Sequence, residues 1–456
     1  MTGPGGYHVQ IESLARDLGL DFFPIEVEVV PPSFMMEVAV YGLPVRMPHW
    51  SFGLRYIYQL VQHRMGYSRI FEVVFPGNPG RAYLANTNTP QENNLVLAHV
   101  LGHADFSKHN LLFQRAQQQV GFHVVELAAA HAHHIDQAIA RHGQQRVEAV
   151  LDAALALEQH IDEHRPLARA PYPQTEPPAE PHRVAGFQKR FQALPGEDEL
   201  QASTLEHVRV SLPPHPELDL LWLIAHYAPE LEDWERDIFL AVREESFYFH
   251  PVFSCHIMNE GWASYWHARL LREARFLPST DYLDALKSHS DVVRPYASDN
   301  QVALSINPYH LGFVMWDRMI EAHGLEKARR IMCEEDDFSF IHNYLDAELA
   351  RDLGLFAFIS KRNGEVRVAD WSIESVQENI LAQRYHFGAP RIAAARIGID
   401  GSLDLQHDHL ADGRGLDLEY ARKVLGYIQS IWRRPVVLNT VDSRERDIVL
   451  KVGGPS

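Results

Sequence analysis

Two stretches far apart in this 456-residue chain are its most informative part: NNLVLAHVLGHADF at residues 93–106 and HIMNEGWASYWH at residues 256–267. Histidines at positions i and i+4 lie on one face of a helix, so His99 and His103 can approach one divalent cation while the backbone stays regular. A third ligand has to come from elsewhere, and Glu260 is the best candidate. The two stretches together predict a metal site.

The helical pattern of each stretch supports this prediction. Residues 92–106 contain no proline and place apolar residues, both histidines and a carboxylate along one stripe. Pro251 indicates the start of the second helix. His256, Glu260 and His267 then fall on one side at steps of four and seven residues. If the two stripes face each other, up to four ring nitrogens and two carboxylates converge.

A structural interpretation of the histidines is the alternative. The chain contains 27 histidines, and some of them fall at helical spacing by chance. His131, His133 and His134 form such a group in a polar helix, where a solvated face is expected. A histidine on an apolar helix face is also more often a hydrogen-bonded core residue than a ligand. The sequence leaves both interpretations open.

Composition and charge narrow the functional class. The chain has 46% hydrophobic and 22% charged residues, as an ordinary globular protein has. Its 42 basic and 60 acidic side chains give a formal charge of −18, which argues against nonspecific binding to nucleic acid or anionic membranes. Residues 1–6 lack the features of a signal peptide, and the apolar runs are too short to span a bilayer. We therefore expect a cytoplasmic protein without membrane insertion.

The two cysteines cannot build a disulfide framework and fit a reducing compartment. Cys255 precedes His256, which raises the alternative of a thiol nucleophile. A buried free thiol is the commoner role.

The length favours two units of an α+β fold. Residues 1–384 are predicted to form a mainly helical body, with a Pro-rich excursion at about 165–216. Residues 385–456 predict a small module of strand-strand-helix-strand-strand order, in which 397–405 has the Asp-Gly signature of a hairpin. Such a module more often binds a protein partner or mediates assembly than performs chemistry.

Several motifs occur together in one order: GLDFFP at 19–24, HWSFG at 49–53, AHVLGHADF at 98–106, MNEGWASYWH at 258–267 and NPYHLGF at 307–313. As a set they resemble the stage V sporulation protein R (SpoVR) family, from about residue 10 to residue 350. The resemblance implies a link to the spore cortex, a peptidoglycan layer, but it does not define a reaction. The chain departs from the family pattern at Asn86, where a glutamate is expected, and at Ser107 and His109.

A second resemblance concerns chemistry. The segment 259–265 is similar to the Asn-Glu-Gly-aromatic-Ala segment of aminopeptidase-type zinc peptidases, in which the glutamate is the third zinc ligand after a His-Glu-x-x-His helix. This similarity implies a zinc-peptidase-like (gluzincin-like) body with His99, His103 and Glu260 as ligands. Position 100 is valine, so the glutamate that would activate the attacking water is missing.

The leading hypothesis is a metal-dependent amide hydrolase, with zinc as the expected metal. Because Val100 cannot accept a proton, we nominate Glu245, His256 and His267 as bases. Asp105 and His109 are alternatives with a different role. Either one would not bind the metal itself but would orient a ligand imidazole through its second nitrogen.

Two other functions stay open at the level of the sequence. The first is a non-catalytic regulator or scaffold that uses the C-terminal module to engage a partner, which the missing glutamate favours. The second is a two-metal helical oxidase that adds Glu92, Glu148 and Asp152 to the histidines. For Glu148 and Asp152 a solvated acidic face is the commoner role.

Overall fold

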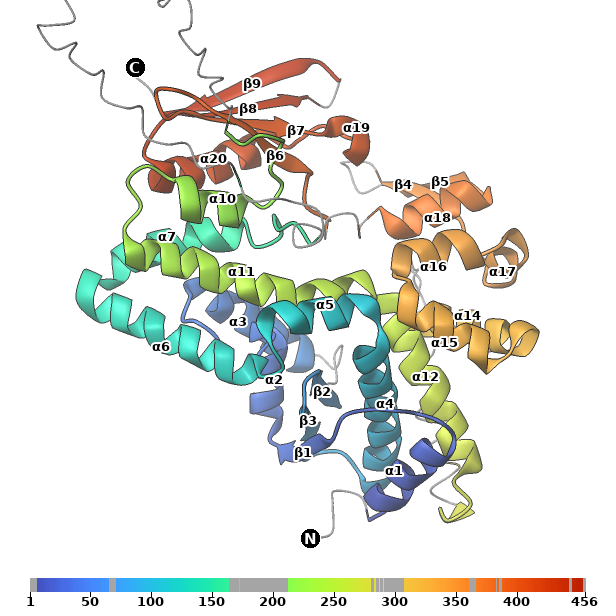
Figure 1. Cartoon of the computed structure of the whole chain (residues 1–456). Coiled ribbons are helices and arrows are strands. Elements are labelled where there is room, and N and C mark those ends of the chain that lie inside the picture. Colours follow the sequence, from blue (N-terminus) through green and yellow to red (C-terminus); the bar gives the residue numbers. More distant parts are fainter. Residues whose placement is uncertain are drawn as a thin grey trace, which may run out of the picture.

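The structure, a computed structural model, describes residues 6–64, 71–163, 212–279, 307–360, 366–382, 388–442 and 445–453, together with a few single positions. This part of the chain is mainly helical and carries three small sheets, which confirms the α+β class (Figure 1). Most of the Pro-rich stretch at 165–216 lies outside the described residues.

The N-terminal part contains a small sheet and the helices around it. Its elements are α1 (His8–Asp17), β1 (Ile25–Val30), α2 (Pro32–Tyr41), α3 (Trp50–Arg64), β2 (Glu72–Phe75), β3 (Gly80–Ala85), α4 (Pro90–His109), α5 (Leu111–Val120), α6 (Val124–His142) and α7 (Gln144–Ala156). The central part continues with α10 (Leu220–Tyr227), α11 (Asp233–Ser254), α12 (His256–Glu273), α14 (Pro308–His323), α15 (Leu325–Glu334), α16 (Asp337–Tyr344), α17 (Ala347–Asp352), β4 (Ala357–Ser360), β5 (Val366–Asp370) and α18 (Ile373–Leu381).

The first sheet lies against α4. Its strand order is β1-β3-β2, with β1 parallel and β2 antiparallel to the central β3. Ala82 and Leu84 of β3 form an apolar cluster with Val96 and Val100 of α4, and Val74 of β2 packs against this cluster. Burial of these side chains fixes the face of α4 that meets the sheet.

Helices α4, α12 and α14 pack closely because small residues lie where they cross. A Cβ atom on Gly102 of α4 would lie 2.7 Å from the Cα of Ala263 on α12, and one on Gly261 would collide with the backbone of Gly312 on α14. A side chain at these glycines would therefore separate the helices. The missing Cβ atoms allow α4 and α12 to lie side by side along much of their length (Figure 1).

Polar anchors fix the ends and the rotation of these helices. Asp337 accepts hydrogen bonds from the backbone N–H groups of Ile257 and Met258, at 2.8 and 2.9 Å, at the start of α12. Such bonds satisfy donors that have no partner within a helix. Asp105 of α4 accepts a 3.0 Å bond from the indole of Trp262 on α12. The prediction that Pro251 starts this helix was wrong, because Pro251 lies in the last turn of α11.

The C-terminal elements are β6 (Ile392–Ile397), β7 (Leu403–His407), α19 (His409–Asp412), α20 (Leu418–Trp432), β8 (Val436–Val441) and β9 (Asp447–Val452). They form a four-stranded sheet of order β6-β7-β8-β9, in which the parallel pair β7 and β8 is joined through α20. A parallel pair needs such a crossover. Trp432 and Leu438 share one apolar cluster with Leu151 of α7 and Leu221 of α10. The domain boundary at residue 384 stays a prediction, and the sheet shares its core with the body.

None of the described helices has the length and apolar character that crossing a bilayer requires.

A partly buried ion cluster joins α6, α11 and the segment after α2. Glu245 of α11 accepts a 2.7 Å hydrogen bond from Arg46 and lies 3.4 Å from His131 of α6, which also lies 3.1 Å from Glu244. Burial opposes the charged ring, but the bonds to Glu244 and Glu245 raise the pKa of His131 to about 9. His131 is thus an ion-paired residue rather than part of a solvated face, whereas His133 and His134 are exposed as expected.

We predict that Gly102→Ala lowers the free energy of unfolding by about 1–3 kcal/mol, because the added methyl group forces α4 away from α12. Gly426→Ala is the matched control, since Gly426 lies within α20 with open space around it. That control is expected to stabilise by about 0.5–1 kcal/mol through helix propensity. Urea denaturation measures both changes, and equal stabilisation by the two substitutions would contradict the close packing.

The ion cluster predicts a pH dependence of stability. Since the pKa of His131 is raised from 6.5 to about 9 on folding, its contribution is fully present below pH 6.5 and is lost as the pH rises through about 9. His131→Gln is expected to remove this decline, whereas His134→Gln keeps it. Urea denaturation across this pH interval provides the measurement, and an unchanged pH profile in His131→Gln would count against the assignment.

Candidate metal centre

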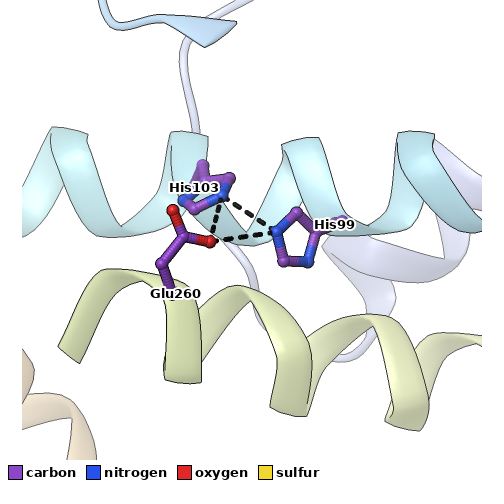
Figure 2. Close-up of side chains that lie close together, drawn as sticks. All are labelled: His99, His103 and Glu260. Atoms are coloured by element: carbon purple, nitrogen blue, oxygen red, sulfur yellow. Dashed lines mark hydrogen bonds and ion pairs between the residues drawn. The ribbon is translucent and has the colours of Figure 1, made fainter. Parts of the chain in front are cut away.

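The two stretches that the sequence singled out meet in the structure. Figure 2 shows His99 and His103 on α4 facing Glu260 on α12. The Nε2 atoms of the two imidazoles lie 3.0 Å apart, and Glu260 Oε2 lies 3.4 Å from each of them. Among the described residues, this is the one group of three or more His, Cys, Asp or Glu side chains arranged to hold a metal ion. The predicted convergence of His99, His103 and Glu260 is therefore present.

Neighbouring side chains orient both rings. Asn259 Oδ1 lies 2.9 Å from His103 Nδ1 and accepts its proton in a hydrogen bond, which leaves a lone pair on Nε2. His267 Nδ1 lies 3.0 Å from His99 Nδ1, on the side of the ring away from Glu260. When His99 donates this bond, its Nε2 also presents a lone pair. Outer partners of this kind fix the tautomer and direction of metal-binding imidazoles.

In that tautomer the centre of the cluster contains acceptors without a donor. Two imidazole lone pairs and a carboxylate oxygen face one another, and within the described chain Glu260 Oε2 is buried without a hydrogen-bond partner. Burying such a set is costly unless a proton or a cation lies among the acceptors. The cluster therefore has the chemistry of a cation site.

The spacing of the three atoms fits a small divalent ion. Ligands at the usual zinc distances of about 2.0–2.1 Å in tetrahedral geometry are separated from each other by roughly 3.3 Å. The observed separations are 3.0, 3.4 and 3.4 Å. Two nitrogens and one oxygen suit a borderline metal such as zinc, and three protein ligands leave a coordination position open.

The charges in the cluster are strongly coupled. Burial alone would raise the pKa of Glu260, but the neighbouring His103 and His99 hold it well below its usual range. The pKa of His103 is raised, because the Glu260 carboxylate outweighs the effect of burial. Burial and the nearby His103 lower the pKa of His99. Glu260 is thus ionised and attracts positive charge to this point.

A second carboxylate, which the sequence did not single out, lies beside the cluster. Glu72 Oε1, from β2, is 4.0 Å from His99 Nε2. Burial raises the pKa of Glu72 to about 7, with the Glu260 charge acting in the same direction and His103 opposing it. The only signal in the sequence is that Glu72 is a single charged residue among apolar ones at 71–75.

Tyr309 and His256 complete the surroundings. The Tyr309 ring, from the first turn of α14, stacks on His99 with the ring centroids 6.1 Å apart. The Glu260 charge and burial raise the pKa of Tyr309 well above its usual range, so its hydroxyl is protonated. His256 Nε2 lies 3.9 Å from Glu260 Oε1, and the His256 side chain is 41% exposed.

The nominated bases occupy three different environments. His256 faces the outer oxygen of Glu260, and His267 contacts the far edge of His99. Glu245, on α11, is paired with Arg46 in the separate ion cluster. Val100, at the place of the missing peptidase glutamate, is fully buried in the apolar cluster between α4 and the sheet.

The residues proposed for an outer shell or a second metal have other partners. Asp105 binds Trp262 and the backbone of Asp21, and His109 binds Asp21. Asn259 and His267 contact the ligand rings in their place. Glu92 closes the capping box at the start of α4.

Glu148 and Asp152, the other residues proposed for a second metal, also have partners elsewhere. Glu148 accepts a hydrogen bond from Gln144, and Asp152 contacts His49 and Trp50. Cys255 is fully buried, which raises the pKa of its thiol well above the usual value and suits a structural role.

Comparisons with known proteins identify the family of the chain. No solved structure matches the chain. The Uncharacterized protein YcgB of Escherichia coli (strain K12) is 28% identical over an alignment of 473 positions, which covers 95% of this chain and 90% of that protein. The family model described as SpoVR like protein matches residues 5–388, the part of the chain that contains the whole cluster. The chain belongs to the SpoVR family.

Proposed function

We propose that the His99, His103 and Glu260 cluster binds a divalent metal ion, with zinc as the expected metal, and that the protein hydrolyses amide bonds. The observation that supports this proposal is the convergence of three acceptor atoms within 3.4 Å, with both ring nitrogens directed toward one carboxylate oxygen. A metal held there polarises a carbonyl and lowers the pKa of the attacking water. The order of ligands along α4 and α12 resembles that of gluzincin peptidases.

The surrounding side chains have proposed roles in this chemistry. His267 and Asn259 are positioning residues, because each holds the outer nitrogen of a ligand ring. The Tyr309 hydroxyl, protonated and next to Glu260, is suited to donate a hydrogen bond to a substrate oxygen. His256 lies at the exposed side of Glu260 and is suited to contact a bound substrate.

The substrate class follows from the family and the chemistry together. The SpoVR family is named for a stage of sporulation, and the cortex that forms then is peptidoglycan, whose stem peptides are joined by amide bonds. Peptides and peptidoglycan fragments that carry such bonds are therefore the first substrates to test. Treatment with a metal chelator is expected to abolish their hydrolysis, and added zinc to restore it.

A second function is favoured by one observation. Val100 is packed into an apolar cluster, so α4 supplies no base at the usual peptidase position. On this alternative the protein is a metal-binding regulator without turnover. Its C-terminal module would bind a protein partner. Two large apolar residues of this module, Ile399 and Leu410, are 93% and 83% exposed to solvent. Bound metal without hydrolysis of any amide substrate would favour this function.

We predict that His103→Ala and Glu260→Ala each weaken zinc binding by more than about 100-fold, since each removes a direct ligand and outer partners alone account for 10–100-fold. His134→Ala, on the exposed face of α6, is the matched control and is expected to retain zinc. Metal content measured by mass spectrometry tests this. Unchanged zinc in both ligand variants would exclude the site.

Replacement of a positioning residue is expected to give an intermediate effect. Asn259→Ala removes the acceptor of the His103 Nδ1–H bond, so the ring is free to rotate and to change tautomer. We expect zinc affinity to fall by about 10–100-fold while the fold is retained. Competition with a chromophoric chelator measures the affinity, and wild-type affinity in this variant would show that Asn259 does not orient the ligand.

A further inference from the structure

A catalytic carboxylate is required by the proposed hydrolysis but is absent from α4. In a peptidase of this kind a carboxylate beside the metal accepts a proton from the attacking water. Position 100 holds a valine whose side chain is fully buried against the sheet. Any base therefore has to come from another element that reaches the Nε2 side of the two imidazoles.

Strand β2 carries such a group. Successive side chains of a strand point to opposite faces, so Glu72 and Val74 share one face of β2. Val74 packs on the apolar cluster that contains Val96 and Val100 of α4. Leu84, the β3 partner of Glu72 in the register, belongs to the same cluster. Glu72 is thus a carboxylate on a strand face that is otherwise apolar and directed at α4.

Burial of a carboxylate on such a face is unfavourable unless it has a function or a partner. Glu72 is 21% exposed in its side chain and lies at the end of the strand nearest the cluster. Its Oε1 atom is 4.0 Å from His99 Nε2, the nitrogen that faces Glu260 and not the one that faces His267. The carboxylate therefore approaches the side of the ring on which a metal would lie.

The distances separate Glu72 from the three ligands. His99, His103 and Glu260 each offer an atom within 4.8 Å of the others, and Glu72 does not join this group. A carboxylate beside a ligand set, but not part of it, is suited to accept a proton from a water held at the site without taking the place of a ligand. This is the location of a general base.

We propose that Glu72 is the general base of this site and takes the role that Val100 cannot fill; the proposal rests on the amide hydrolysis proposed above. One O–H bond of water breaks and its proton passes to Glu72, while the water oxygen bonds to the amide carbonyl carbon. The C–N bond then breaks, and Glu72 returns the proton to the amine nitrogen. The products are a carboxylic acid and an amine, and no oxidant or reductant is consumed.

The other nominated bases have less suitable positions. His267 lies behind His99, on the side away from Glu260, and Glu245 is paired with Arg46 in a separate cluster. His256 faces the outer oxygen of Glu260, 3.9 Å away, and not the two Nε2 atoms. The geometry thus favours Glu72, on the ligand side, over His256.

The test compares Glu72→Gln with Glu260→Ala in the full-length, zinc-loaded protein. We expect Glu72→Gln to retain zinc within about twofold of the wild type and to lower kcat for a hydrolysed peptide amide by about 100-fold or more, the usual contribution of a general base. KM should change little. Glu26→Gln, which changes an exposed glutamate on β1 of the same sheet, is the matched control and should match the wild type in both measurements.

Two results would overturn the inference. If Glu72→Gln loses zinc as completely as Glu260→Ala, then Glu72 is a ligand rather than a base. If it retains both zinc and full kcat, then another residue accepts the proton. Failure of the proposed function gives a different result: the zinc-loaded wild type hydrolyses none of the amide substrates. In that case the inference about Glu72 is also wrong.

Discussion

The close approach of α4 and α12 is the constraint on which the cluster depends. Gly102 has no side chain where it meets Ala263, and Gly261 has none where it meets Gly312 on the next helix. Each contact brings two helix backbones nearer than ordinary side chains permit. His103 lies one residue beyond Gly102 on α4, and Glu260 lies one residue before Gly261 on α12. The same small residues that pack the helices therefore bring an imidazole and a carboxylate within 3.4 Å of each other.

The packing also explains why the ligand rings are well oriented. Asn259 and Glu260 are consecutive on α12, so the residue that orients His103 and the residue that joins it as a ligand move together. His267 is seven residues after Glu260, two helical turns along the same face, and there it meets the outer nitrogen of His99. A single rigid helix thus supplies one ligand and both ring partners, and Asp337 anchors its first turn.

Local pattern was sufficient to predict part of this site. The i, i+4 histidines and the glutamate of the second stretch were identified because helical spacing makes a shared face visible in the sequence. Glu72 was missed because its role depends on the register of β2 and β3 and on the packing of the sheet against α4, which are long-range contacts. Glu245 was nominated because it is near Glu260 in the sequence, yet it lies on the preceding helix and faces Arg46.

The roles proposed for the two carboxylates follow from how they approach the histidines. Glu260 lies at equal distances from both Nε2 atoms, so its oxygen completes a triangle around one point, and the imidazoles keep it ionised. Glu72 approaches one of these atoms from β2, where burial and the charge of Glu260 disfavour its own ionisation. A carboxylate that holds a proton more readily is better suited to accept one from water, and one that stays ionised is better suited to bind a cation. The difference is set by the elements that carry the two side chains, because α12 is packed directly against α4 whereas β2 meets α4 through a layer of apolar side chains.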